Sequence, residues 1–193
     1  EGDYSQAAFL AVLGCVIGGI TVTGLNPDSQ QGDKVILDIL KRCGGKFKPV
    51  EGGLHFDRSL LKATEIDLAD CPDLGPILFT LGCFCSGETV IRNAGRLRLK
   101  ESDRIEAMQT ELRKMGARIE VDGDTVHIQG VALHAPNAPL SGHNDHRIVM
   151  AMAVAALAAG QPAVIEGANA VNKSWPDFFE VIKGLGAHVT NQG

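Results

Sequence analysis

The chain is poor in the residues that several common functions require. It has one Trp and one Tyr among its 193 residues, which leaves little material for stacking nucleic-acid bases. Its formal net charge of −5 argues against binding nucleic acid through a general excess of positive charge. We therefore expect no nucleic-acid partner, although a local basic cluster could still bind phosphate.

The five cysteines follow no metal-binding or redox spacing. No CxxC pair occurs, and Cys83 and Cys85 lie two residues apart, which suits neither a zinc knuckle nor a redox pair. We expect buried, reduced thiols in a cytoplasmic protein. The histidines other than His146 also lack a metal-site spacing, so we predict no metal and no cofactor.

Long hydrophobic runs are missing as well. The apolar stretches at residues 7–20 and 148–159 are shorter than the roughly 20 residues that a membrane-spanning helix needs. The first stretch follows Glu1, Gly2 and Asp3, where a signal peptide would be basic. We expect no membrane partner. Because the chain does not begin with Met, we also expect a piece of a longer or processed polypeptide.

The sequence does contain a threefold internal repeat of about 70 residues per unit. Each unit opens with an apolar helix of small residues, continues with a β-branched strand, and then forms an amphipathic helix that ends in glycine. The first helices are expected at residues 6–19, 75–87 and 147–160, the strands at 20–23, 89–91 and 163–165, and the second helices at 33–44, 102–116 and 176–186.

The first two units then add a hairpin, with glycine turns at residues 52–53 and 123–124. The third unit ends in an extended segment, 188–190, without a closing strand, so we infer that this strand comes from elsewhere. Residues 64–71 and 131–143 are expected to be surface connectors. The prediction is one α/β (α+β) domain, 1–193, with three βαβαββ-type repeats (about 1–62, 63–132 and 133–193) around a pseudo-threefold axis.

Charged residues gather at the predicted helix N-termini, most densely at Lys100–Arg104. Helix N-termini carry partial positive charge, so Arg104, Arg147 and Lys173 oppose the helix dipole there. For any single cluster, a solvated helix cap is the commoner explanation. Repeated threefold, the pattern favours N-termini that converge on a bound anion, which arginine can hold bidentately.

Two carboxylates belong to these clusters. Asp73 could cap a helix or act on a ligand, and both possibilities stay open. Near Glu101, cations would stabilise the charged form of the carboxyl, while burial in a closed cleft would favour the neutral form. Such opposed influences suit a group that transfers protons. His146 is expected only to support the site, and Asp145 to cap its helix or orient Arg147.

At these residues the sequence resembles the 5-enolpyruvylshikimate-3-phosphate (EPSP) synthase family of enolpyruvyl transferases. The resemblance covers nearly the whole chain, in family order, at Glu1–Ser5, Arg98–Arg104, Glu111–Gly116, Asn144–Arg147 and Lys173–Phe179. It implies two similar domains of three βαβαββ units each, with substrates bound between them. This chain resembles the C-terminal domain, so the resemblance implies that the N-terminal partner domain is absent.

The resemblance also implies an activity, the transfer of an enolpyruvyl group from phosphoenolpyruvate to shikimate 3-phosphate in aromatic amino-acid biosynthesis. It assigns Asp73 as the base that contacts the shikimate hydroxyls, Glu101 as the acid, and Lys100 as a bridge between the substrates. It assigns the grip on phosphoenolpyruvate to Arg104, Arg147 and Lys173. The full-length protein is expected to be a cytoplasmic monomer, and this chain alone to be inactive and to bind ligands weakly.

Some family members carry Asn at a shikimate-contacting position where this chain has Arg96. Two alternatives also stay open. One is the related enolpyruvyl transferase that acts on UDP-N-acetylglucosamine, against which the Lys-Glu-Ser-Asp-Arg and Asn-Asp-His-Arg runs speak. The other is a non-catalytic phosphate-binding domain. The chain could also be one segment of a multifunctional polypeptide.

Overall fold

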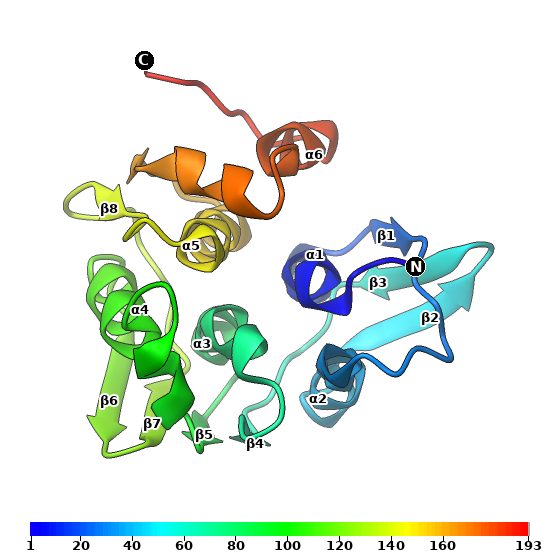
Figure 1. Ribbon diagram of the computed structural model, residues 1–193, viewed down its shortest axis with the longest axis horizontal. Helices are drawn as coiled ribbons and strands as arrows, with labels where there is room; N and C mark the ends of the chain where they lie inside the picture. The colour runs from blue at the N-terminus through cyan, green and yellow to red at the C-terminus, as the bar shows by residue number, and fades with distance from the viewer. Residues whose placement is uncertain (193) are drawn as a thin grey trace.

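Three apolar helices lie side by side at the centre of the structure, a computed structural model that describes residues 1–192. They are α1 (Tyr4–Ile17), α3 (Gly75–Phe84) and α5 (His146–Ala159), and each contacts the other two. Small residues let the helices approach closely, and helices that are apolar nearly all round are buried on most sides. Figure 1 shows the three nearly end-on, with the sheets arranged outside them.

The second repeat shows the predicted order in full. Its strands are β4 (Glu65–Asp67), β5 (Glu88–Arg92), β6 (Arg118–Asp122) and β7 (Thr125–Gln129), with α3 between β4 and β5 and α4 (Arg104–Arg113) between β5 and β6. The sheet order is β4-β5-β7-β6, in which only the β4–β5 pair is parallel. This is a βαβαββ unit, as the repeat pattern predicts.

The first and third repeats are partial copies of this unit. In the first, β1 (Ile20–Thr23), β2 (Lys46–Val50) and β3 (Gly53–Asp57) form an antiparallel sheet of order β1-β3-β2. In the third, β8 (Leu140–Ser141) pairs in parallel with β9 (Ile165–Glu166). By position, β8 and β9 correspond to β4 and β5. Within residues 1–192, the third repeat has no strands in the places of β6 and β7.

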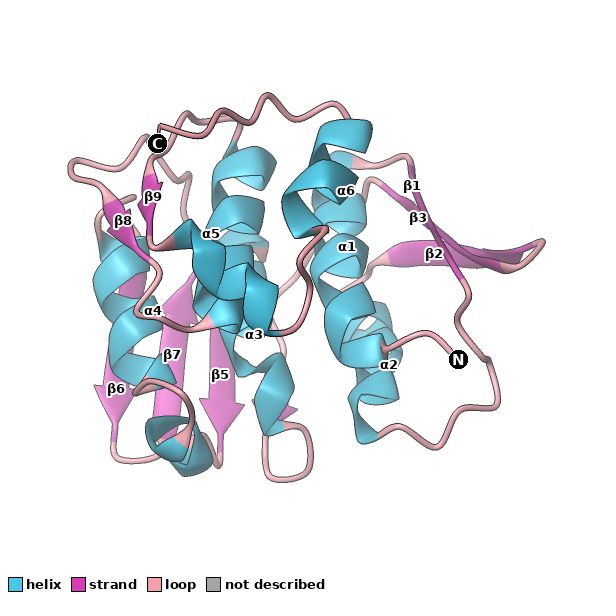
Figure 2. Cartoon of the chain, turned by 45° about the horizontal axis from the view of Figure 1, so that its top comes forward, coloured by secondary structure: helices cyan, strands magenta, loops and turns pink. Residues whose placement is uncertain are grey.

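The second helix of each repeat packs outside the central three. These helices are α2 (Ile36–Arg42), which follows a 3-10 turn at Gly32–Val35, then α4, and then α6 (Phe178–Gly184). Helix α2 contacts α1, and α4 contacts both α3 and α5. Figure 2 shows the β5–β7–β6 sheet and the β1–β3–β2 sheet on opposite sides of the central helices.

All five cysteines in the described chain are buried and free, which confirms the expectation of buried thiols without disulfides. Burial raises the pKa of Cys15 and Cys71 to about 11 and that of Cys83 to about 12, so these three are unreactive at neutral pH. No helix within residues 1–192 combines the length and apolar character needed to cross a membrane.

Three sequence predictions differ from the structure. The expected connectors at 64–71 and 131–143 contain β4 and β8, strands of three and two residues that are too short to show a clear alternation. The extended segment expected at 188–190 pairs with no described strand and has no regular secondary structure. A strand is defined by its hydrogen bonds to a neighbour.

Candidate anion-binding active site

The N-termini of four helices meet at one place, which confirms the predicted convergence. Arg147, in the first turn of α5, donates from NH2 to Ser5 Oγ in the first turn of α1, at 3.1 Å. The same nitrogen lies 3.8 Å from Asp73 Oδ2, just before α3. Arg104, the first residue of α4, reaches Asp73 Oδ1 from NH1 at 3.3 Å. Side chains from all three repeats therefore contribute to one site.

Asp73 lies at the centre of these contacts. It occupies a 3-10 turn, Pro72–Leu74, and its side chain caps no helix, so of the two possibilities the capping role is excluded. Its carboxylate contacts Lys100 Nζ at 3.1 Å in addition to the two arginines. Burial alone would raise the pKa of Asp73, but Arg147, Lys100 and Arg104 together hold it below the usual value. Asp73 is thus ionised at neutral pH.

Arg104 and Asp145 form a buried bidentate ion pair. Nε donates to Oδ2 at 2.8 Å and NH2 to Oδ1 at 3.1 Å. Asp145 also accepts from Ser102 Oγ at 2.9 Å and from the backbone N–H of Arg147 at 3.0 Å, so it caps α5 as predicted. Burial opposes ionisation, yet the donors from Arg104, Ser102 and Arg147 lower the pKa of Asp145. Asp145 therefore supplies, from within this chain, the negative charge that was expected beside Arg104 at the start of α4.

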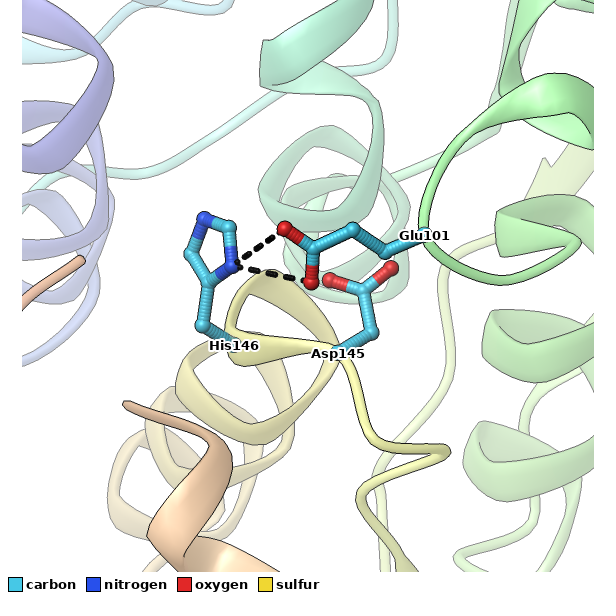
Figure 3. A group of neighbouring side chains, drawn as sticks. All are labelled: Glu101, Asp145 and His146. Atoms are coloured by element: carbon cyan, nitrogen blue, oxygen red, sulfur yellow. Dashed lines mark hydrogen bonds and ion pairs between the residues drawn. The ribbon is translucent and has the colours of Figure 1, made fainter. Parts of the chain in front are cut away.

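Glu101 contacts two basic side chains, those of His146 and Lys173. Its carboxylate is 3.2 Å from His146 Nδ1 and 3.5 Å from Lys173 Nζ. Figure 3 shows the Glu101 and His146 side chains pointing toward each other, with Asp145 beside them. The structure thus gives His146 a direct contact with the predicted acid, whereas the sequence indicated only general support.

Lys173 is placed differently from its prediction. It ends a 3-10 turn, Ala168–Lys173, and α6 begins only at Phe178. The carbonyl end of a helical turn favours a cation, so Lys173 does not oppose a helix dipole and the prediction of a threefold-equivalent position is wrong for this residue. Helix α6 begins two residues later than predicted, after Trp175-Pro176, and Lys173 lies in the 3-10 turn that precedes it. Its Nζ donates to the carbonyl oxygen of Asn144.

Glu101, Asp145 and His146 form the one group of possible metal ligands found among residues 1–192, with ligand atoms within 4.8 Å of one another. The donors already present argue against a metal ion. Each Asp145 oxygen accepts two hydrogen bonds, and Lys173 lies against Glu101. A divalent cation here would displace these bonds and would face nearby positive charges.

The site retains an unused donor. Arg147 NH1 is buried and has no hydrogen-bond partner within the described chain. A buried donor without a partner is costly and calls for an explanation. Around it, four cations face three carboxylates: Lys100, Arg104, Arg147 and Lys173 against Asp73, Glu101 and Asp145. The arrangement leaves one buried guanidinium nitrogen free among these four cations, so it can donate to an anion.

Ser5 and Asp33 belong to this region although the sequence gave them no role. Ser5 Oγ donates to Asp3 Oδ1 at 2.7 Å while accepting from Arg147, and so fixes the guanidinium. Burial, followed by the nearby charge of Asp73, raises the pKa of Asp33. A Ser at a helix start usually caps it, and the sequence offers no signal that it binds an arginine from a helix 142 positions away.

Arg96 lies in an exposed 3-10 turn, Gly95–Leu99, and donates to the carbonyl oxygen of Ala69 at 3.2 Å. With Leu99 and Asp124 it lines a shallow hollow of about 400 Å³. No hydrogen bond or ion pair joins Arg96 to the cation cluster in the described chain.

Comparisons with known proteins agree with the architecture. The family model described as EPSP synthase (3-phosphoshikimate 1-carboxyvinyltransferase) matches residues 1–182. Relatives named 3-phosphoshikimate 1-carboxyvinyltransferase from Clostridium botulinum (strain Eklund 17B / Type B) and Methanocaldococcus jannaschii are 40% and 42% identical over 97% and 98% of this chain. Each match covers 44% of the relative, so the chain spans less than half the length of these proteins.

Solved structures show the same fold. EPSP synthase from Acinetobacter baumannii has a TM-score of 0.77 at 27% identity, over 93% of this chain and 45% of that one. The enolpyruvyl transferase NikO from Streptomyces tendae also has a TM-score of 0.77, at 21% identity, over 96% of this chain and 43% of that one, and it supports the fold alone.

Three repeats whose helix N-termini meet at a cation-rich site define a domain of the enolpyruvyl transferase type. Within that class, the chain belongs to the EPSP synthase family, as the sequence motifs predict.

Proposed function

We propose that this chain is the C-terminal part of an enzyme that transfers the enolpyruvyl group of phosphoenolpyruvate to the 5-hydroxyl of shikimate 3-phosphate, with release of phosphate. The observation that carries the proposal is the buried, unpartnered NH1 of Arg147, in a cluster that also brings Lys100, Arg104 and Lys173 together. Membership of the EPSP synthase family supports phosphoenolpyruvate and shikimate 3-phosphate as the anions that bind there.

The cations bind phosphoenolpyruvate, which carries a carboxylate and a phosphate. Arg147 NH1 and Lys173 Nζ are the donors best placed for it, one unpartnered and the other on a half-exposed side chain. Arg104 is almost fully buried against Asp145, so it takes part through NH1, the nitrogen that now faces Asp73. Lys100 contacts Asp73 and bridges the two substrates. Fixed cations stabilise developing negative charge without any metal or cofactor.

Proton transfer is divided between two carboxylates. Asp73, kept ionised by its cations, contacts the shikimate hydroxyls and accepts the proton of the 5-hydroxyl as the oxygen attacks C2 of phosphoenolpyruvate. Glu101 donates a proton to the methylene carbon, which becomes a methyl group in the tetrahedral intermediate. Glu101 then takes a proton back from that methyl group as the C–O bond to phosphate breaks. His146 and Lys173 hold Glu101 in position for both steps.

The proposal includes a partner, the N-terminal half of the longer protein. It would supply the rest of the substrate site and the strands that the third repeat lacks beside β9. The isolated chain is accordingly inactive and binds ligands weakly, and the full-length protein is a monomer. The buried, free thiols suit a reducing compartment, so a cytoplasmic location remains part of the proposal.

Phosphate release from phosphoenolpyruvate and shikimate 3-phosphate tests the proposal. The longer protein with both halves should turn over, and this chain alone should not. In the longer protein, Glu101→Gln should lower kcat by about a hundredfold or more, because the proton donor is lost. Glu180→Gln is the matched control, since Glu180 is an exposed helix residue paired only with Lys183.

Three outcomes would contradict the proposal. Turnover by the isolated chain would show that no partner half is needed. Unchanged kcat in Glu101→Gln would remove the acid role and favour a non-catalytic binding domain. Protection of the longer protein against thermal unfolding by UDP-N-acetylglucosamine, and not by shikimate 3-phosphate, would favour the sibling transferase.

A further inference from the structure

A buried carboxylate on α4 contacts the loop that leads into α5. Glu111 lies in the third turn of α4, and its side chain is only 2% exposed. It plays no part in the candidate site described above. A buried charge is costly unless it is paired and hydrogen-bonded, so its partners indicate what it stabilises. In Figure 1 and Figure 2, α4 lies next to β8, the strand at the start of this loop.

Both carboxylate oxygens of Glu111 are used. Oε1 meets His143 Nε2 at 2.8 Å, while Oε2 accepts from the backbone N–H of Ser141 at 2.9 Å and lies 2.7 Å from Lys114 Nζ. Burial opposes ionisation of Glu111, but these three donors keep its pKa below the usual value. Two of the three partners are in the loop before α5, so Glu111 holds that loop against α4.

The loop needs to be held, because two consecutive residues in it adopt left-handed backbone conformations. His143 has φ +50° and Asn144 has φ +51°, and neither is glycine. Such conformations persist where the surrounding contacts enforce them. The turn is further closed by the N–H of His143 on Ser141 Oγ at 3.1 Å and by the N–H of Asp145 on the carbonyl oxygen of Gly142 at 2.9 Å.

The turn sets the direction of the residues that follow it. Asp145, His146 and Arg147 come immediately after Asn144, and the carbonyl oxygen of Asn144 also accepts from Lys173. A change of the two left-handed angles would swing these side chains away from Arg104, Glu101 and Asp73.

We propose that Glu111 is a positioning residue, which enforces the left-handed His143–Asn144 turn and thereby places Asp145, His146 and Arg147 at the anion site. This role rests on the proposed function, which makes the anion site a substrate site. Glu111 orients the residues of that site and takes no part in proton transfer.

Amide hydrogen exchange on the chain with Glu111→Gln tests the proposal. The informative amides are those of Asp145 and Arg147, whose bonds do not involve Glu111. The protection of these two amides from exchange should fall by about tenfold, which corresponds to the loss of one hydrogen bond to a charged group. Amides in α1 should keep their protection. The control is Glu120→Gln, which removes an exposed charge on β6 and should change neither group.

A rescue variant separates positioning from general stability. Glycine adopts positive φ freely, so Asn144→Gly in the Glu111→Gln background should restore part of the lost protection, since only one of the two left-handed residues, His143, then needs enforcement. Asn144 is suited to this because its side chain makes no hydrogen bond within the described chain. Uniform loss of protection across all helices, without rescue by glycine, would overturn the proposal. Unchanged protection at Asp145 and Arg147 would overturn it as well.

Two further measurements keep the test decisive. If Glu111→Gln fails to fold, His143→Asn removes the ring contact, from a side chain that is one-third exposed, while keeping a residue type that adopts positive φ, and should give the same local loss. Affinity for inorganic phosphate, measured by calorimetry on the longer protein with both halves, should fall in parallel with protection. If the unsubstituted longer protein binds no phosphate, the proposed function loses support, while the exchange data still decide whether Glu111 positions the turn.

Discussion

Replacing Asp145 with Asn should be among the most destabilising single changes in this chain. The substitution keeps the size of the side chain but removes the charge that compensates Arg104, whose side chain is 3% exposed. The asparagine amide also has an N–H group in place of one carboxylate oxygen, and this donor would face Arg104 and Ser102, which both donate to Asp145. Removing one partner of a buried pair leaves the other charge uncompensated, at a typical cost of about 3–5 kcal/mol.

A Coulomb estimate gives the same magnitude. For unit charges about 4 Å apart at an effective dielectric constant of about 20, the interaction is roughly 4 kcal/mol. The remaining acid near Arg104 is Asp73, at 3.3 Å but 39% exposed, so solvent weakens its compensation. For a chain of this length, a loss of that size lowers the melting temperature by roughly 6–20 °C.

The contribution of Asp145 to the free energy of unfolding should decrease as the pH falls. Because the pKa of Asp145 is lower in the folded chain than its usual value of 3.8, its stabilising contribution is complete above that usual value. The contribution is lost as pH falls through the lower, folded-state pKa. The difference in unfolding free energy between the parent and Asp145→Asn should therefore be largest near neutral pH and shrink below about pH 4.

Urea unfolding followed by circular dichroism at several pH values measures this difference. Glu180→Gln serves as the control, because its exposed pair with Lys183 is one helical turn apart and contributes at most about 0.5 kcal/mol. A loss below about 1 kcal/mol for Asp145→Asn would refute the reasoning from burial. So would a difference that stays constant down to the lowest pH at which the parent chain is folded.

Two further predictions concern a turn and a ligand contact. A Cβ at Gly53 would overlap the carbonyl oxygen of Val22, so Gly53→Ala should cost about 3 kcal/mol in thermal or urea unfolding. Gly52→Ala meets open space at φ +75° and should cost only about 1 kcal/mol; equal losses would exclude the steric explanation. Arg147→Lys keeps the charge but loses the planar guanidinium. The affinity of the longer protein for phosphate, measured by calorimetry, should therefore fall about tenfold with little change in stability. Unchanged affinity would exclude Arg147 as the ligand donor.

The fold could be predicted in outline because its signals are local. The apolar helices α1, α3 and α5 are nearly continuous runs of small and aliphatic residues, and glycines mark their ends. The strands of the two hairpins carry aromatic or β-branched residues on either side of glycine turns, and the sequence predicts them at nearly the observed positions. Strands β4 and β8 could not be found this way, because their pairing partners lie more than 20 residues away.

The site was predicted in part for the same reason. The cations and the carboxylates Asp73 and Glu101 stand in short runs with distinctive spacing, and the structure brings them together. Which cation meets which carboxylate is a property of packing between repeats. The sequence placed Lys173 at a helix start, where the structure has the end of a 3-10 turn. It also could not show that Ser5 holds Arg147.

The sequence by itself determined the repeat, the family and the inventory of charges at the helix N-termini, because each of these depends on residues close together in the chain. Tertiary structure alone decided how those charges are paired. Asp145 neutralises Arg104 only because α4 and α5 pack side by side, and Arg147 NH1 is left without a partner only because α1, α3 and α5 meet at their N-termini. Electrostatic energy depends on distance and burial, and both are set by the packing of segments far apart in the sequence.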